Sequence, residues 1–438
     1  MLHSRFLKDR RGGVAPMFAL AIIPVIGFVG ASVDYSRANS IKVGMQSALD
    51  ATALAMAKLA PTLTPAELQT KTTAYFNAMF NHADAKSMTV TPSYTTAGGS
   101  QLTISAATSM DTSFMKLMGY SNLDIRSAST VKWGNTRLRV ALVLDNTGSM
   151  SSAGKMEALK TATNGLLTQL KNAATNNGDV YVSIIPFVKD VNVGASNYSA
   201  SWVDWSDWDK NNGSCSKGRD VKNYNSCMQE NGNPTWTSAS HDTWNGCVTD
   251  RGSSTTPTGQ DYDTNADAPN SSQSSKFSAE QYGSCPRAIM PLSYNWSSMT
   301  TLVSEMAPAG NTNQGIGLAH GWMSLVGGGP YPAPPPKDPA YTYQQVIILL
   351  TDGMNTQNRW FTNQASIDAR QAMTCANVKA AGITLYTIQV NTDGDPTSTL
   401  LQNCASTSDK FFLVTSSSGI STIFNQIGTN LARLRISS

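Results

Sequence analysis

Along the chain, the pattern of hydrophobic positions begins with one long run that carries no charge. Residues 12–33 read GGVAPMFALAIIPVIGFVGASV, and Asp34 follows them. As an α-helix, these 22 residues would extend about 33 Å, enough to cross the hydrocarbon core of a bilayer. Basic residues favour the cytoplasmic side of a span. We therefore predict a cytoplasmic segment at residues 1–13 and a transmembrane helix at residues 14–33, because the run follows Arg5, Lys8, Arg10 and Arg11.

A cleaved signal peptide is the alternative interpretation of this run. Its apolar region would be shorter, and it would end at a small-residue cleavage site. Here a helical pattern continues beyond the run, with small or apolar residues on one stripe: Ile41, Met45, Ala48, Thr52, Ala55 and Leu59. We therefore predict a retained single-pass anchor.

Residues 34–133 change from a helical pattern to an alternating one. Pro61 ends the first helix, and the capping box Thr64–Glu67 starts a second helix that runs to about Phe80. Three later stretches alternate as strands do, with Gly98-Gly99 at a turn: SMTVTPSY, QLTISAAT and LDIRSASTVKW. The pattern predicts a small α+β region next to the membrane.

From residue 136 to residue 438, continuous apolar runs alternate with amphipathic segments. The runs LRVALVLD, DVYVSIIPF, QVIILLTDG, GITLYTIQV and KFFLVTS are typical of parallel strands buried on both faces. Helices are expected between them, at residues 155–172, 363–381 and 420–434 among others. This alternation predicts an α/β domain with a doubly wound parallel sheet.

Residues 195–287 interrupt that alternation and are rich in Ser, Asn, Asp and Trp. A structureless loop of this length is rare in a compact domain, so we predict a surface insertion with structure of its own. Trp202, Trp205 and Trp208 lie three residues apart. We expect them to pack inside the insertion, and a face that binds a partner is the alternative.

The six cysteines indicate disulfides in an oxidising compartment, with buried reduced thiols as the alternative. Cys375 and Cys404 are expected to bond to each other. Two further disulfides are expected within the insertion, with their pairing left open, among Cys215, Cys227, Cys247 and Cys285. The sequence contains no CxxC pair, and its four histidines are scattered, which argues against a zinc site.

Composition and charge narrow the function classes. Only 14% of the residues are charged, and the net charge is +3 without a Lys/Arg-rich run, so a nucleic-acid partner is not expected. Ser, Thr, Asn and Gly are abundant instead, as is common in proteins exported from a bacterial cytoplasm.

The candidate chemistry lies where the first buried strand of the α/β domain ends. The run Asp145-Asn146-Thr147-Gly148-Ser149 places one carboxylate and two hydroxyls at the carboxyl edge of the sheet, where ligands bind in such folds. Asp352 ends another buried strand at the same edge, and Thr312 lies in a Gly-bounded loop before a helix. These hard oxygen donors favour Mg²⁺ or Mn²⁺ over Zn²⁺.

The segments ALVLDNTGSM, GNTNQGIGLAHGW and ILLTDGMN resemble the three segments of the metal-ion-dependent adhesion site of von Willebrand factor A domains. The resemblance implies that Thr147 and Ser149 offer hydroxyls to Mg²⁺, with Mn²⁺ or Ca²⁺ as alternatives. It implies that Asp145 and Asp352 act directly or through water, and that Thr312 joins in one conformational state. The sixth coordination position would take an acidic side chain from a protein partner. Thr147 stands where Ser is commoner in the family.

The whole layout, from the start RRGGVAPMFALAIIPVIGFVGASVDYSRA to the C-terminus, is similar to the TadG-like proteins of tight-adherence (Flp) pilus assembly. The resemblance implies a single-pass protein of the bacterial inner membrane, with the N-terminus in the cytoplasm and the bulk of the chain in the periplasm. Its expected partners are pilus subunits or assembly proteins, and neither an enzymatic activity nor a small-molecule substrate is expected.

Three alternatives remain at this point. A cell-surface adhesin would use the same A domain and the same metal. A degenerate A domain would keep the hydroxyls for structural reasons only. A phospho-aspartate enzyme would use Asp145 as nucleophile, because DNTGS is close to the DKTGT motif of P-type ATPases. However, Asn146 replaces the Lys of that motif, and Thr356 replaces the second Asp of the GDGxND loop.

Overall fold

The computed structural model describes residues 14–96, 99–134, 136–218, 221–252 and 261–436, and the chain divides into two compact units, Met1–Asn135 and Thr136–Ser438. The predicted cytoplasmic segment at residues 1–13 and Gly98 of the predicted turn lie outside the described residues.

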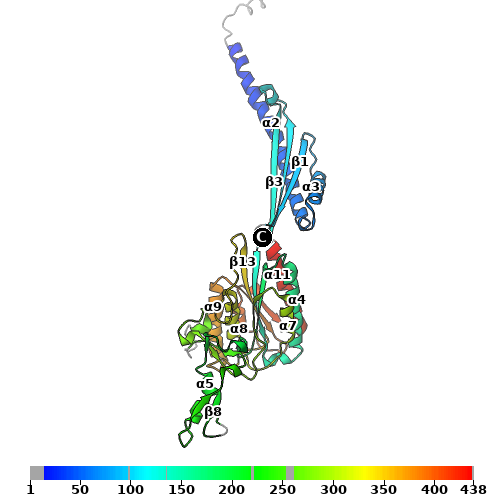
Figure 1. The fold of residues 1–438 in the computed structure, drawn as a ribbon. Helices are drawn as coiled ribbons and strands as arrows, with labels where there is room; N and C mark the ends of the chain where they lie inside the picture. The colour runs from blue at the N-terminus through cyan, green and yellow to red at the C-terminus, as the bar shows by residue number, and fades with distance from the viewer. Residues whose placement is uncertain (1–13, 97–98, 135, 219–220, 253–260, 437–438) are drawn as a thin grey trace, which may run out of the picture. The chain divides into compact units, whose positions relative to one another are not determined.

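The first unit is built on one long helix, α2 (Val14–Ala57), which contains most of the uncharged run (Figure 1). Among the described helices, only this one is long and apolar enough to cross a membrane, over Met17–Ala57. Its large apolar side chains from Met17 to Val29 are exposed, as expected for residues that contact lipid. The helix ends earlier than predicted, and Pro61 lies in a short 3₁₀ turn, η1 (Ala60–Thr62).

A second helix and a three-stranded antiparallel sheet complete this unit. The helix is α3 (Pro65–Met79), and the predicted capping box between Thr64 and Glu67 is present at its start. The sheet has the order β1 (Lys86–Thr95), β2 (Ser100–Asp111) and β3 (Asn122–Trp133), with the 3₁₀ turn η2 (Met115–Met118) between β2 and β3. The second half of α2 packs on the sheet and buries Ile41 and Met45 completely.

Five parallel strands form the centre of the second unit. Their order in the sheet is β15 (Phe411–Val414), β14 (Thr384–Val390), β13 (Thr342–Thr351), β4 (Thr136–Asp145) and β5 (Val180–Phe187). Outside the insertion, the described α-helices of this unit are α4 (Lys155–Ala173), α7 (Trp296–Ser304), α8 (Gln314–Val326), α9 (Gln364–Ala380), α10 (Thr399–Cys404) and α11 (Ser417–Ile436).

Alternate residues of β4 face two separate cores, which makes the sheet doubly wound. Leu142 and Leu144 belong to a core that also contains residues of α4, α7 and α11. Ala141 and Val143 belong to a second core, which contains residues of α8 and α9. Figure 1 shows the strands between these layers of helices. The predicted α/β fold class is therefore confirmed.

The sheet is mixed, however, because short strands from the insertion and from the residues just before it extend the sheet beyond β5. These are β6 (Val191–Asn192), β10 (Cys247–Thr249), β11 (Phe277–Ala279) and β7 (Val203–Asp204), and β6 pairs antiparallel with β5. A further strand, β12 (Met290–Ser293), also pairs antiparallel with β5. Val203, Val248 and Phe277 are buried in the second core. The insertion is thus continuous with the domain and does not merely lie on its surface.

The outer part of the insertion is a small lobe with short elements. α5 (Trp208–Asn211) leads into this lobe, which contains β8 (Gly213–Cys215), α6 (Tyr224–Cys227) and β9 (Trp236–Ser238). The N–H of Ala239 donates to the carbonyl of Asn212 (2.9 Å), so the chain enters and leaves this lobe at one point. The remaining described 3₁₀ turns are η3 (Gly148–Ser151), η4 (Ala195–Asn197), η5 (His241–Thr243), η6 (Tyr262–Thr264), η7 (Gln273–Ser275) and η8 (Ser408–Lys410).

Trp202, Trp205 and Trp208 pack inside the insertion, as predicted. The Trp205 ring stacks on the His241 ring at 3.8 Å and meets the edges of Trp208 and Trp244, each at 5.3 Å. Trp208 and Trp244 are each only 2% exposed, and Trp202 packs against Phe277 in the second core.

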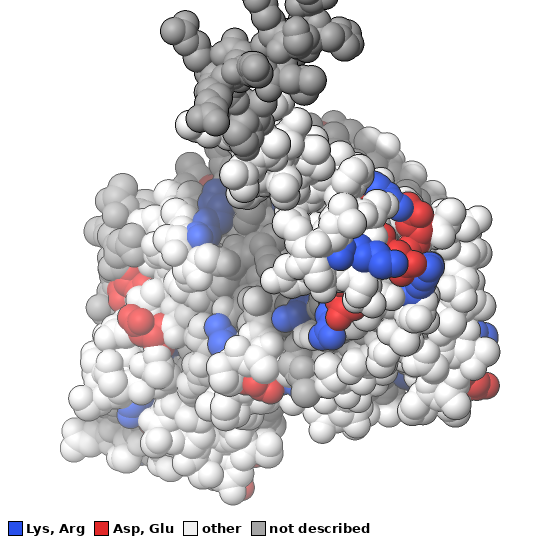
Figure 2. Space-filling model, turned by 90° about the horizontal axis from the view of Figure 1, so that it is seen from above, with Lys and Arg blue, Asp and Glu red and all other residues white. Residues whose placement is uncertain are grey.

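All six cysteines are paired in the structure. Cys375 of α9 is bonded to Cys404 of α10, and the insertion contains Cys215–Cys227 in the outer lobe and Cys247–Cys285 at its base. On the face drawn in Figure 2, most of the surface is uncharged, and basic and acidic side chains lie near each other in small groups.

Candidate metal centre

The sheet brings the first and third predicted metal-binding segments together. β4 and β13 are parallel neighbours with Leu144 opposite Leu350, so Asp145 and Asp352 lie at the same edge. After Asp145 the chain turns through η3, which contains Gly148 and Ser149. The carboxyl ends of parallel strands leave such an edge open for a ligand.

Four of the five predicted residues form one hydrogen-bonded network. The Thr147 N–H donates to Asp145 Oδ1 (2.7 Å), and the Thr147 hydroxyl lies 3.0 Å from the Ser149 hydroxyl. Ser149 Oγ donates to Asp352 Oδ1 (2.6 Å). The Thr351 hydroxyl donates to Asp145 Oδ2 (2.6 Å), so both oxygens of Asp145 accept a bond.

The Thr312 segment joins this network through its backbone. Gly148 N–H donates to the Gly310 carbonyl (3.0 Å), which holds the second segment against the first. Thr312 N–H donates to the Thr356 hydroxyl (2.8 Å), and the Thr312 carbonyl accepts from the Thr356 N–H (2.9 Å). Thr312 is 4% exposed and lies just before α8.

A buried ammonium, which the sequence pattern did not indicate, also lies in the network. Lys155, the first residue of α4, is 0% exposed, and its Nζ lies 2.7 Å from Asp352 Oδ2 and 2.9 Å from Asp393 Oδ2. Asp393 follows β14, so it lies at the same edge as Asp145 and Asp352. The position of Asp393 after the run GITLYTIQV was the signal that could have identified it.

Burial and charge perturb the titration of this site. Burial of Asp145, together with the nearby Asp352 carboxylate, raises the pKa of Asp145 to about 7 despite hydrogen bonds from Thr147 and Thr351. Burial alone would lower the pKa of Lys155, but its bonds to Asp352 and Asp393 raise that pKa above the usual value. The site therefore concentrates negative charge that one ammonium only partly balances.

The donor set fits a small divalent cation. Adjacent ligands around an octahedral Mg²⁺ lie about 3 Å apart when each is about 2.1 Å from the ion. The Thr147–Ser149 and Ser149–Asp352 oxygen distances of 3.0 and 2.6 Å are of this size. Among the described residues, no group of three or more His, Cys, Asp or Glu could hold a metal. An ion at this edge would therefore be held by hydroxyls together with two carboxylates.

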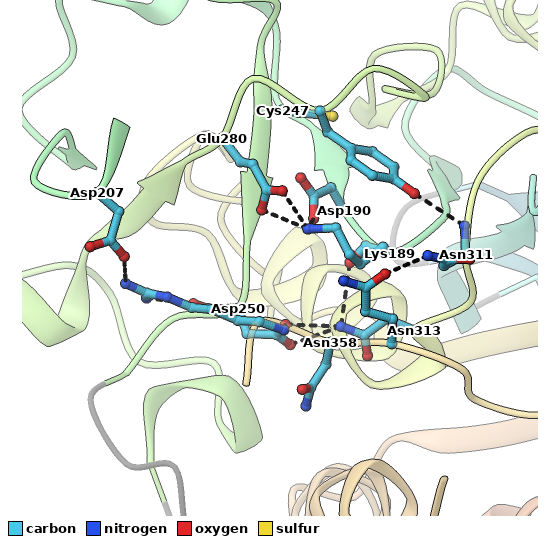
Figure 3. Close-up of polar contacts among 12 residues, drawn as sticks. Lys189, Asp190, Asp207, Cys247, Asp250, Glu280, Asn311, Asn313 and Asn358 are labelled. Carbon is cyan, nitrogen blue, oxygen red and sulfur yellow. Dashed lines mark hydrogen bonds and ion pairs between the residues drawn. The ribbon is translucent and has the colours of Figure 1, made fainter. Parts of the chain in front are cut away.

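The insertion is bonded to the loops that carry the second and third segments (Figure 3). Asp250, which follows β10, is buried, and its carboxylate accepts from the Asn313 amide (2.9 and 3.0 Å) and from the Arg359 N–H (3.0 Å). Arg359 in turn donates to the carboxylate of Asp207. Asn313 follows Thr312 directly, so Asp250 holds the side chain of the residue next to a predicted ligand.

A second charged group lies beside this contact, at the turn between β5 and β6 (Figure 3). Lys189 Nζ lies 2.6 Å from the Glu280 carboxylate and 3.0 Å from Asp190 Oδ1. Burial, together with the Glu280 charge, raises the pKa of Asp190 to about 8 although Lys189 lowers it. The Asn313 N–H donates to the Val188 carbonyl of this turn (3.2 Å). The β5–β6 turn thus supports the Thr312 segment from the other side.

Two family models match parts of the chain. Residues 12–58 match a model described as putative Flp pilus-assembly TadE/G-like, and residues 264–426 match the von Willebrand factor type A domain. The second match contains Thr312 and Asp352, and Asp145–Ser149 lies outside it. No curated protein sequence matches the chain at a significant level.

Several solved structures resemble the chain distantly. Proximal thread matrix protein 1 from the mussel byssus is 12% identical, with 69% of this chain and 48% of that chain covered and a TM-score of 0.34. The pilus adhesin SpaC from Lactobacillus rhamnosus GG is 12% identical, with 81% and 35% covered and a TM-score of 0.37. The chain thus spans less than half the length of these two proteins.

The vWF domain of the type V pili tip protein Mfa5 from Porphyromonas gingivalis is 8% identical to the chain, with a TM-score of 0.37. That match covers 69% of this chain and 97% of the Mfa5 domain. A further structure of the mussel protein is described as having a zinc-occupied MIDAS motif.

Proposed function

Since the chain carries a TadE/G-like segment and a von Willebrand factor type A domain, we propose that it is a membrane-anchored component of Flp/Tad-type pilus assembly. It holds pilus subunits or assembly proteins through a divalent cation, and it binds rather than catalyses. We call the proposed metal site at the carboxyl edge of the sheet, formed by Asp145, Thr147, Ser149, Thr312 and Asp352, the metal edge. A cell-surface adhesin could use the same metal edge, and the TadE/G-like match at residues 12–58 favours the assembly role.

The observation that carries the proposal is the hydroxyl–carboxylate network at the sheet edge. Asp145, Thr147, Ser149 and Asp352 would hold Mg²⁺, and Thr312 lies in the neighbouring segment. When bound, the ion would supply an electrophilic position for a carboxylate of the partner. The Thr351 hydroxyl and the Thr147 N–H orient Asp145 for this role.

The burial of Asp145 argues against a phospho-aspartate enzyme. Its side chain is 0% exposed, so a phosphoryl group, which is much larger than a metal ion, has no open approach to the carboxylate. A nucleophilic carboxylate needs an oxygen that can reach a phosphoryl group.

The proposed orientation places the second unit in the periplasm of a single-pass inner-membrane protein. Basic residues precede the apolar run, which favours a cytoplasmic start. All six cysteines are in disulfides, which persist in an oxidising compartment.

Asp145→Ala tests the proposal. We expect this variant to lose Mg²⁺-dependent capture of partners in crosslinking experiments on intact cells, because the ion loses a carboxylate ligand. Asp395→Ala is the matched control, since Asp395 is an exposed acid at the same end of β14, and it should leave capture unchanged. Circular dichroism of both purified full-length variants checks that the fold is kept. Equal capture by wild type and Asp145→Ala would rule out the proposed metal site.

A further inference from the structure

In the first unit, the turn between β2 and β3 carries large apolar side chains that the protein leaves uncovered. Phe114 is 39% exposed, Leu117 82%, Met118 51% and Tyr120 62%. Four such residues in one short turn form an apolar patch of a kind that soluble surfaces rarely expose without a partner. We call residues Phe114–Tyr120 the hairpin tip.

The hairpin tip packs against the apolar run of α2. A Cβ at Gly30 would lie 2.4 Å from Phe114 Cβ, so only glycine allows the Phe114 side chain to approach this closely. One turn earlier, a Cβ at Gly27 would lie 3.5 Å from Met118 Sδ, an ordinary contact distance. The tip therefore lies alongside a part of α2 that precedes Asp34, the first charged residue after the run.

Asp34 fixes the hairpin tip in this position. It is 0% exposed, and its carboxylate accepts from the N–H groups of Ser113 (3.0 Å), Phe114 (2.8 Å) and Met115 (2.8 Å). Arg37 also donates to the Ser113 hydroxyl (3.1 Å). The apolar side chains are thus held beside the helix by a charged group at the end of the run.

These contacts set the depth of the tip relative to the span. Gly27 precedes Val33, the last residue of the uncharged run, by six positions, which corresponds to about 9 Å along a helix. Amphipathic elements at a membrane surface bury their apolar face about 5–10 Å into the boundary between headgroups and acyl chains. The exposed Lys116 lies among the apolar residues and is long enough to reach lipid headgroups.

We propose that the hairpin tip inserts into the outer leaflet of the bilayer beside α2, as a second membrane-contacting element of this protein. The occupant of the apolar patch is lipid. The proposal rests on the membrane anchor of the proposed function, because the patch is continuous with the exposed apolar face of α2.

Site-specific labelling tests this insertion. None of the six native cysteines is free, so a Leu117→Cys variant of the full chain has one thiol for an environment-sensitive fluorophore. The labelled protein is reconstituted in nanodiscs of phosphatidylcholine and phosphatidylglycerol, with or without doxyl-labelled lipid. We expect blue-shifted emission and strong quenching by doxyl lipid.

Thr96→Cys is the matched control. Thr96 is an exposed residue beyond β1, at the opposite end of the three-stranded sheet from the hairpin tip. The length of β2 separates the two ends by about 36 Å. A label at Thr96→Cys should emit as in water and should not be quenched.

Phe28→Cys separates failure of the tip from failure of the anchor, since Phe28 is 77% exposed within the run. If the label at Phe28→Cys is quenched and that at Leu117→Cys emits as in water, the anchor holds and the tip proposal is wrong. If neither is quenched, the anchor and the tip proposal both fail. Gly30→Ala should reduce quenching at Leu117→Cys, whereas Gly27→Ala should not. Equal quenching in both backgrounds would contradict the packing of the tip on α2.

Discussion

Lys155 is the residue that distinguishes the metal edge from a simple cluster of acids. Its ammonium lies between Asp352 and Asp393 without exposure to solvent, so it balances part of the charge that a divalent cation would also balance. Two positive groups that share Asp352 repel each other, so the Lys155 ammonium should lower the affinity of the site for a divalent cation. The position of Lys155 in a helix gave no sign of this role, because Lys residues in amphipathic helices are usually solvated.

Lys155→Met should separate the two effects of this ammonium. Without a metal, we expect the free energy of unfolding to fall by about 3–5 kcal/mol, because Asp352 loses a buried ion pair. With saturating Mg²⁺, most of that loss should be recovered, and the variant should bind Mg²⁺ more tightly than wild type. Urea unfolding with EDTA or Mg²⁺ measures both. Lys160→Met, which removes a surface pair with Glu157, should change stability by less than about 1 kcal/mol. A loss that Mg²⁺ leaves unchanged would contradict this account.

His320 gives the second unit a dependence on acid that is separate from the metal edge. Burial, with a smaller effect of Arg251, lowers the pKa of His320 to about 3, and its Nδ1 lies 2.9 Å from the Tyr331 hydroxyl. In the unfolded chain the His320 imidazole binds a proton near pH 6.5, whereas in the folded chain it stays neutral until a much lower pH. The contribution of His320 to the free energy of unfolding is therefore fully present above pH 6.5, and it is lost as the pH falls from 6.5 toward 3.

Between pH 7 and pH 5, this single group should reduce the free energy of unfolding by about 2 kcal/mol. Urea unfolding at the two pH values measures the change. His320→Gln can still bond to Tyr331 and does not titrate, so the difference between the two pH values should shrink by that amount. An unchanged difference in His320→Gln would show that other groups cause it.

Among the elements, the central strands were predictable from the sequence, and the short strands beyond β5 were not. β4 and β13 contain continuous apolar runs, which are typical of parallel strands buried on both faces. β6 and β7 have two residues each, and β10 and β11 have three, too few for any period to be visible. β6 pairs with the edge of β5, and β10, β11 and β7 then follow one another outward from β6. Such pairing is a tertiary cause that local sequence does not reveal.

The contacts of Asp250 with Asn313 and Arg359, in the loops after Gly310 and after Asp352, could not be predicted for the same reason. Asp250 lies 63 residues before Asn313 and 109 before Arg359, and only the folded sheet brings them together. By contrast, Asp145 and Asp352 each end an apolar run, so their shared edge followed from the sequence.

Asp250→Ala should therefore weaken Mg²⁺ binding although Asp250 is not itself a ligand. The change leaves the Asn313 amide and the Arg359 N–H without their acceptor, at a cost of about 1–3 kcal/mol, and it frees the segment that contains Thr312. Isothermal titration calorimetry should give a several-fold higher Kd. Asp242→Ala, an exposed acid of the same insertion, is the control and should keep the wild-type Kd. An unchanged Kd in Asp250→Ala would mean that the insertion does not support the site.

At the scale of the whole molecule, the two units have different tasks. The first unit contains the apolar helix and the hairpin tip, which are suited to lipid. The second unit contains the metal edge, the insertion and all three disulfides. The sequence indicated this division because periodicity, composition and candidate chemistry all change near residue 136.

The closed base of the outer lobe makes that lobe a convenient place for engineering. Because Ala239 is hydrogen-bonded to Asn212, a foreign loop placed between these positions begins and ends where the chain already meets itself. A fluorescent protein or an affinity epitope grafted there would lie outside the ten-stranded sheet and outside the segments that contain Asp145, Thr312 and Asp352. The grafted group would then report where this protein resides in the cell.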